Sequence, residues 1–286
     1  MKSARKVSRI QSSRPTLEGA GVRLMRAFAD DDPLLDPFLL LDDFHSNDPR
    51  DYLAGFPWHP HRGIETITYM LHGEVKHGDS LGNQGVVRPG EVQWMTAGSG
   101  IIHSEMPQEP PDRLLWGFQL WANLPAAHKM MDPRYREVTR RDIPEVNTRE
   151  GAKIKIICGQ VEGGKGPVQD IVTEPEYLDV MVIPGAEFRR SIPTGHNVLA
   201  YVIEGSARFG ADRQSAQEKH LVVFDQGEEV SVSTDRQPVR FLLVSGRPIR
   251  EPVAWRGPIV MISEAELDLA FEEYQNGTFL NYQKRL

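Results

Sequence analysis

The chain has 286 residues, of which 40% are hydrophobic, and this length suffices for two domains of modest size. Its formal net charge of -7 repels phosphate backbones, which argues against direct binding of nucleic acid. No apolar run approaches the roughly 20 residues of a membrane span, and the one cysteine, Cys158, excludes an internal disulfide and favours a reducing, cytoplasmic compartment.

Short β-rich runs punctuated by Gly, Pro, Asp and Asn dominate the chain, a pattern typical of β-sandwiches and barrels. The first of these runs that offers potential metal ligands is His59-Pro-His61. A β-strand turns every second side chain to the same face, so we expect both imidazoles to point one way. The odd positions of 65–71 should continue this face, whereas Thr66 and Thr68 should face away.

A second pair with the same spacing, His103 and Glu105, follows the flexible segment 97–100. If the two pairs lie side by side, three imidazoles and one carboxylate converge. Such donors suit Fe, Ni, Cu, Co or Zn, and the chain lacks the cysteines of a structural zinc module. We therefore predict a metal site with open positions for substrate or dioxygen. The alternative is that these are ordinary surface or core histidines.

Further along the chain, the apolar run 114–121 predicts a buried strand, and the Pro-rich, charged run 124–147 predicts a connecting excursion. Several histidines of the first half lack a partner at ligand spacing. We expect solvated loop or strand positions for His45, His72, His77 and His128.

An internal repeat relates residues 69–78 to residues 201–210 and indicates a duplication into two β-barrels. The repeat predicts that the first barrel holds metal and that the second is structural or binds a partner. When the copies are aligned, no ligand position of the second copy holds a histidine or an acidic residue. Ser191 aligns with His59, Pro193 with His61, Val232 with His103 and Thr234 with Glu105.

One strong helix is predicted, at 263–274. Ser263 and Glu266 form a capping box before it, and Asn276-Gly277 ends it. Its apolar positions recur at helical spacing and predict a face that packs on the domain, with docking of a subunit as the alternative. This face consists of Leu267, Ala270, Phe271 and Tyr274.

The motifs at 36–44, 59–66 and 98–107 resemble those of the pirin family, a group of bicupin proteins. The likeness covers nearly the whole chain, including 250–258 and the closing helix. It implies an all-β fold of two stacked antiparallel cupin β-barrels with a short C-terminal helix. Residues 1–130 would then form the N-terminal metal-binding cupin, and residues 131–286 a C-terminal cupin without metal ligands.

Carried over by motif, the resemblance implies that His59, His61, His103 and Glu105 bind the metal. Fe(II) is the implied ion, with Ni, Cu, Co, Mn or Zn as alternatives. Glu65 ends a loose HxHx3E motif whose glutamate is itself a ligand in many cupins. In pirins the carboxylate comes from the second pair, so we expect Glu65 to orient a histidine instead.

The activity that the resemblance implies is cleavage of quercetin, a flavonol, by dioxygen. A divalent ion would stabilise the 3-hydroxyl oxygen of the substrate, and Glu105 would take its proton as the catalytic base. Candidate apolar walls for a flat aromatic substrate are Phe44, Phe56, Trp58 and Trp94. Two alternatives stay open. One is an iron-bearing regulatory protein that binds a transcription factor or metabolic enzyme without turnover, and the other is a cupin acting on another small substrate, for instance as an isomerase.

Overall fold

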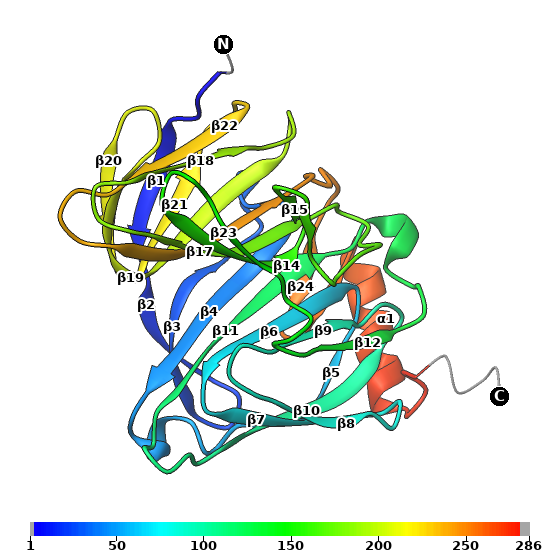
Figure 1. Cartoon of the computed structure of the whole chain (residues 1–286). Helices are drawn as coiled ribbons and strands as arrows, with labels where there is room; N and C mark the ends of the chain where they lie inside the picture. The colour runs from blue at the N-terminus through cyan, green and yellow to red at the C-terminus, as the bar shows by residue number, and fades with distance from the viewer. Residues whose placement is uncertain (1–2, 281–286) are drawn as a thin grey trace. The chain divides into compact units, whose positions relative to one another are not determined.

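The computed structural model describes residues 3–280, and strands make up most of them (Figure 1). The all-β class with a helix near the C-terminus is confirmed. The described residues form two compact units. The N-terminal unit comprises the described parts of Pro15–Asp31, Phe38–Arg140 and Ile249–Leu286. The C-terminal unit comprises those of Met1–Arg14, Asp32–Pro37 and Arg141–Pro248.

The two units therefore interleave along the chain, unlike the continuous segments 1–130 and 131–286 expected from the sequence. The first strand explains part of this difference, because β1 (Val7–Ser12) pairs with β21 (His220–Phe224) in the C-terminal unit. The last segment explains the rest, because its described part, residues 249–280, groups with the N-terminal unit.

The N-terminal unit contains two larger antiparallel sheets, which Figure 1 shows as the strands coloured from blue to green. The seven-stranded sheet has the order β12 (Arg134–Val138), β9 (Val92–Thr96), β6 (Ile64–His72), β11 (Leu115–Asn123), β4 (Phe38–Ser46), β3 (Val22–Ala29) and β2 (Arg14–Glu18). The four-stranded sheet has the order β5 (Phe56–His61), β10 (Ile101–Gln108), β7 (Glu74–Asp79) and β8 (Gln84–Val87). Neither sheet closes on itself, which corrects the expectation of closed barrels.

The C-terminal unit is built around a ten-stranded sheet with an apolar core. Its main path is β1, β21, β19 (Asn197–Phe209), β23 (Val239–Gly246), β17 (Glu176–Val182), β14 (Ala152–Cys158) and β13 (Glu145–Asn147). Three strands lie off this path: β18 (Glu187–Ser191), β20 (Gln214–Gln217) and β22 (Glu229–Ser233). A separate hairpin consists of β15 (Gln160–Val161) and β16 (Gly164–Lys165).

Burial along the strands of the N-terminal unit follows their place in the sheets. The buried strand predicted at 114–121 is confirmed as β11, which lies between β6 and β4. In β10 the odd positions from Ile101 to Pro107 are buried and the even ones are partly exposed or exposed. This alternation is that of a strand with one inward face, and His103 and Glu105 fall on that face. The excursion predicted at 124–147 contains two strands. β12 pairs with β9 and forms an edge of the seven-stranded sheet, and β13 pairs with β14 in the C-terminal unit.

The turn between β5 and β6 transfers the chain from one sheet to the other at Gly63, whose φ of 78° is in the left-handed region. The alternation of side chains between the two faces of β5 therefore does not continue into β6. Thr68 points toward Glu105, as its hydrogen bond to that carboxylate shows. The prediction that Thr68 faces away from the histidines is therefore wrong.

Two buried basic side chains, those of Lys129 and Arg62, hold this turn. The Nζ of Lys129 donates to the carbonyls of Gly63 and Val260, both at 3.0 Å. Burial lowers the pKa of Lys129 to about 7. The guanidinium of Arg62 donates from Nε to the carbonyl of Ser99 at 2.8 Å and pairs through Nη1 with Glu273 of the C-terminal helix at 2.7 Å. The residues next to His61 are thus fixed by the C-terminal segment.

The C-terminal segment contains β24 (Ala254–Arg256), β25 (Ile259–Met261) and the helix α1 (Glu264–Gln275). The predicted helix cap is confirmed, because Ser263 Oγ accepts from the backbone N–H of Glu266. Gly277, with φ of 70°, follows the helix as predicted. Leu267 is buried, whereas Tyr274 is 38% exposed, so the apolar face packs only in part. The two 3-10 turns are η1 (Pro49–Asp51) and η2 (Ala126–His128).

Within residues 3–280, no helix combines the length and the apolarity needed to cross a membrane.

We predict that Gly63→Ala destabilises the chain more than Gly82→Ala. Both glycines have positive φ, so both alanines carry backbone strain. A Cβ at Gly63 would lie 1.9 Å from the Val260 carbonyl oxygen, whereas nothing lies within 4 Å of one at Gly82. The clash should cost about 1–3 kcal/mol beyond the shared strain. Chemical denaturation measures the difference, and equal loss of stability would contradict this role of Gly63.

Candidate metal centre

The pairing of β5 with β10 brings the predicted ligand pairs together. The strands run antiparallel, and His59 lies directly opposite His103. His61 lies two residues from His59 and turns to the same side. His59 Nε2 is 3.0 Å from His61 Nε2 and 2.9 Å from His103 Nε2. The three histidines form one group of potential metal ligands within the described part of the chain, all in the N-terminal unit.

Backbone carbonyls fix the tautomers of two of these rings. His59 Nδ1 lies 2.8 Å from the Pro57 oxygen, and His61 Nδ1 lies 3.0 Å from the Pro258 oxygen. A carbonyl oxygen only accepts hydrogen bonds, so each Nδ1 carries the proton and donates it. In the neutral rings, Nε2 of His59 and Nε2 of His61 are then both unprotonated.

Two unprotonated nitrogens 3.0 Å apart repel each other unless a cation lies between them. Metal–nitrogen bonds of about 2.1 Å at right angles place two ligand nitrogens about 3.0 Å apart. The measured separations of 2.9 and 3.0 Å agree with that spacing. The donor chemistry and the distances therefore fit a divalent transition metal.

Two of the three histidines, His61 and His103, are held in the uncharged form that binds metals. Burial, with His59 alongside, keeps the pKa of His61 well below its ordinary value. Burial also lowers the pKa of His103, and the neighbouring histidines add to the effect. His61 and His103 are each 1% exposed, whereas His59 is half-buried and faces the solvent side of the group.

Glu105 lies beside the histidines on the inward face of β10. Its Oε2 is 4.0 Å from His103 Nε2, so it stands slightly outside the compact group of three. The strands shift register between His103 and Glu105, which places Glu105 opposite Phe56. The carboxylate is 3% exposed and directed toward the interior.

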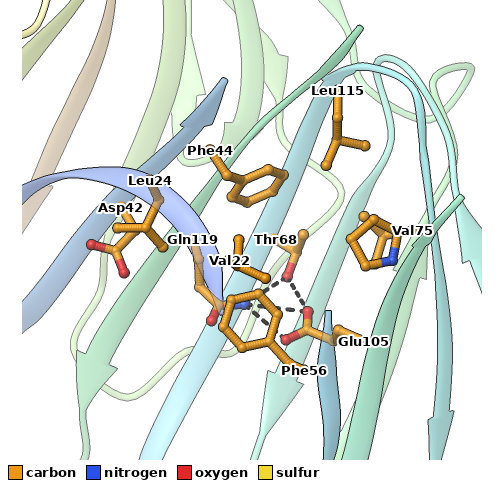
Figure 2. A pocket seen from close by; sticks show the side chains of 11 residues that line it. Val22, Leu24, Asp42, Phe44, Phe56, Thr68, Val75, Glu105, Leu115 and Gln119 are labelled. Atoms are coloured by element: carbon orange, nitrogen blue, oxygen red, sulfur yellow. Dashed lines mark hydrogen bonds between the residues drawn. The ribbon is translucent and has the colours of Figure 1, made fainter. Parts of the chain in front are cut away.

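Two residues that sequence reasoning missed hold this carboxylate, as the dashed lines in Figure 2 show. Thr68 Oγ1 donates to Glu105 Oε1 at 2.8 Å. Gln119 Nε2 donates to both carboxylate oxygens, at 3.2 and 3.1 Å. Thr68 comes from β6 and Gln119 from β11, two neighbouring strands of the seven-stranded sheet. No spacing rule links them to Glu105, because the contact joins different sheets.

His77 is buried, contrary to the expectation of a solvated position. It lies on the inward face of β7, with its ring stacked on Tyr135 at a centroid distance of 4.9 Å. Its Nε2 is 3.3 Å from Asp79 Oδ2. The His77 and His103 ring centroids are 5.4 Å apart, so His77 packs against the group of three histidines. His45 and His128 are exposed, as expected.

Glu65 does not take the position expected for it. Its Oε1 accepts a hydrogen bond of 2.6 Å from Thr96 Oγ1 on β9, rather than one from a histidine. The change of sheet at Gly63 explains this outcome. Burial raises the pKa of Glu65 above its usual value.

The group opens onto a cleft of ≈ 710 Å³, lined by His59 and His61 among others. This volume is in the range of small-molecule sites. Of the expected wall residues, Phe56 and Trp58 line the cleft, and Trp58 is 59% exposed. Trp94 is buried, and Phe44 lines a smaller cavity. Two further tryptophans of the wall, Trp121 and Trp255, were not expected.

Comparisons with known proteins agree with the motifs. The family model described as Pirin matches residues 21–122, and the one described as Pirin C-terminal cupin domain matches residues 177–280. A Pseudomonas aeruginosa protein named "Putative quercetin 2,3-dioxygenase" is 42% identical over 96% of this chain and 97% of its own. Pirin-1 of Arabidopsis thaliana is 46% identical over 86% of this chain and 84% of its own. The crystal structure of a quercetin 2,3-dioxygenase from Acinetobacter baumannii has a TM-score of 0.87 and 31% identity, covering 96% and 98% of the two chains.

We predict that His61→Ala loses stoichiometric metal, because it removes one of three converging nitrogens. Affinity should fall by more than about 100-fold, since loss of a supporting hydrogen bond alone costs about 10–100-fold. The measurement is metal content by mass spectrometry after anaerobic loading with Fe(II). His72→Ala is the matched control, because His72 pairs with Asp112 at the surface. Full occupancy in His61→Ala would refute the ligand assignment.

Proposed function

We propose that this chain, which belongs to the pirin family as its motifs predicted, is a metal-dependent dioxygenase that cleaves flavonols such as quercetin. The observation that carries the proposal is the group of three converging imidazoles, two of them with an unprotonated Nε2, beside a cleft lined by aromatic side chains. Relatives named as quercetin 2,3-dioxygenases support an oxidoreductase.

The metal in this proposal is Fe(II), held by His59, His61, His103 and Glu105. Nickel, copper, cobalt, manganese and zinc accept the same nitrogen and oxygen donors, so the donors alone do not select among them. When bound, such an ion supplies Lewis-acid stabilisation of a substrate oxygen and a site for dioxygen. The remaining tasks belong to the protein's own side chains.

The cleft supplies orientation. Trp58, Trp121 and Trp255 form flat apolar walls that suit a planar aromatic ring. His59 and His61 line the same cleft, so a flavonol seated there directs its 3-hydroxyl group toward them. Burial of the substrate between these walls excludes water from the reacting oxygen.

Glu105 supplies the base. Its carboxylate lies beside His103, where it takes the proton of the 3-hydroxyl group as the oxygen becomes an anion. Thr68 and Gln119 keep it aimed at that point. One flavonol and one dioxygen then yield one ring-opened ester and one carbon monoxide, so the oxidant is fully consumed in the products.

We predict turnover of quercetin by the Fe(II)-loaded chain. The apo protein is loaded anaerobically with Fe(II), mixed with quercetin and dioxygen, and followed by loss of flavonol absorbance and release of carbon monoxide. Equal amounts of quercetin lost and carbon monoxide released are expected. His61→Ala, treated in the same way, should fall to the rate of the uncatalysed reaction.

The opposite outcome is also informative. Absence of turnover with Fe, Ni, Cu, Co and Mn, in protein that binds each of them stoichiometrically, would defeat the dioxygenase proposal. It would favour the alternative of an iron-bearing regulatory protein that binds a transcription factor or metabolic enzyme.

A further inference from the structure

A second, smaller hollow is lined by Glu105 but by none of the three histidines. It is a cavity of ≈ 20 Å³, shown in Figure 2. Its apolar walls come from both sheets of the N-terminal unit. They are Val22, Leu24, Phe44, Phe56, Val75, Pro107 and Leu115. The polar residues that also line it are Asp42, Thr68, Glu105 and Gln119.

The size of this cavity limits its occupant. A site for one water needs roughly 10–15 Å³ on the same scale, so ≈ 20 Å³ admits one water or one diatomic molecule. A flavonol is excluded, since a drug-sized ligand fills a site of about 300–1,000 Å³. The cavity therefore serves a different ligand from the one in the cleft.

The chemistry of the wall disfavours water. A buried water needs two to four polar partners. The Glu105 carboxylate already accepts hydrogen bonds from Thr68 and Gln119. The Asp42 carboxylate accepts two from Arg26, at 2.8 and 2.7 Å. The seven remaining wall residues are apolar, and an apolar wall favours a small apolar molecule.

The cavity is connected to the candidate metal centre through its lining. Glu105 lines it and lies 4.0 Å from His103 Nε2. Asp42, Phe56 and Gln119 line both the cavity and the cleft, so they form the partition between them. A molecule in the cavity thus reaches Glu105 without passing through the space where the flat substrate lies.

We propose that this cavity is a binding site for dioxygen, from which the gas reaches the metal on the Glu105 side while the flavonol occupies the cleft. The role of the gas rests on the proposed dioxygenase function, whereas the affinity of the cavity for a small apolar molecule does not. Dioxygen held there does not compete with the flavonol for the space of the cleft.

The test begins with dioxygen under pressure, because the cavity admits a diatomic molecule. Crystals of the full chain loaded with redox-inert Zn(II) are pressurised with dioxygen, and one dioxygen molecule is expected among Val22, Val75 and Leu115. Val75→Leu adds a methylene to the wall and should abolish this binding. Val87→Leu is the matched control: Val87 pairs with Val75 in the same apolar cluster but does not line the cavity.

Kinetics then connect the cavity to dioxygen. Val75→Leu should raise the KM for dioxygen roughly fivefold, with the KM for quercetin and the metal content unchanged. Val87→Leu should alter neither constant. An empty cavity under pressurised dioxygen, an ordered water hydrogen-bonded in it, or an unchanged KM for dioxygen in Val75→Leu would overturn the proposal.

Failure of the proposed function would be recognised separately. If the chain cleaves no flavonol, the rate at which dioxygen oxidises the bound Fe(II) replaces the KM measurement. Slower oxidation in Val75→Leu than in Val87→Leu, together with dioxygen in the cavity of the pressurised crystals, would still support the dioxygen site. Equal rates would refute it.

Discussion

The antiparallel register between β5 and β10 is the constraint on which the candidate centre depends. It sets His59 opposite His103, and strand alternation then turns His61 to the same side. A slip of one residue would send His103 to the outer face, because side chains alternate along a strand. The shift in register before Glu105 lets the carboxylate approach from a slightly different direction than a regular strand would allow.

The second requirement is that the ring nitrogens face one another without protons. Carbonyls of Pro57 and Pro258 provide this by accepting from the opposite nitrogens of His59 and His61. Pro258 lies between β24 and β25, far along the chain from the histidines. Arg62 and Lys129 tie the same C-terminal segment to the turn beside His61. The C-terminal segment, which belongs to the N-terminal unit, thus contributes to the candidate centre.

Much of this architecture could be predicted from the sequence. The i, i+2 spacing of the histidine pair, the apolar run of β11 and the capping box at Ser263 depend on local rules, and the structure agrees with each. The contacts that were missed join different sheets. Thr68 and Gln119 reach Glu105, and Tyr135 stacks on His77, through tertiary pairing. The predicted contact of Glu65 with a histidine was wrong for a related reason: the chain passes to the other sheet at Gly63, so Glu65 does not continue the face of His59 and His61. A backbone carbonyl such as that of Pro258 has no sequence signature.

The central claim is that one metal ion is bound by His59, His61, His103 and Glu105. Anomalous diffraction from crystals of the Fe(II)-loaded full chain, measured on both sides of the iron absorption edge, tests it most directly. The account predicts a single iron peak about 2.0–2.2 Å from the three Nε2 atoms and from a Glu105 oxygen. Iron bound at another position, or no iron between these side chains at full loading, would contradict it.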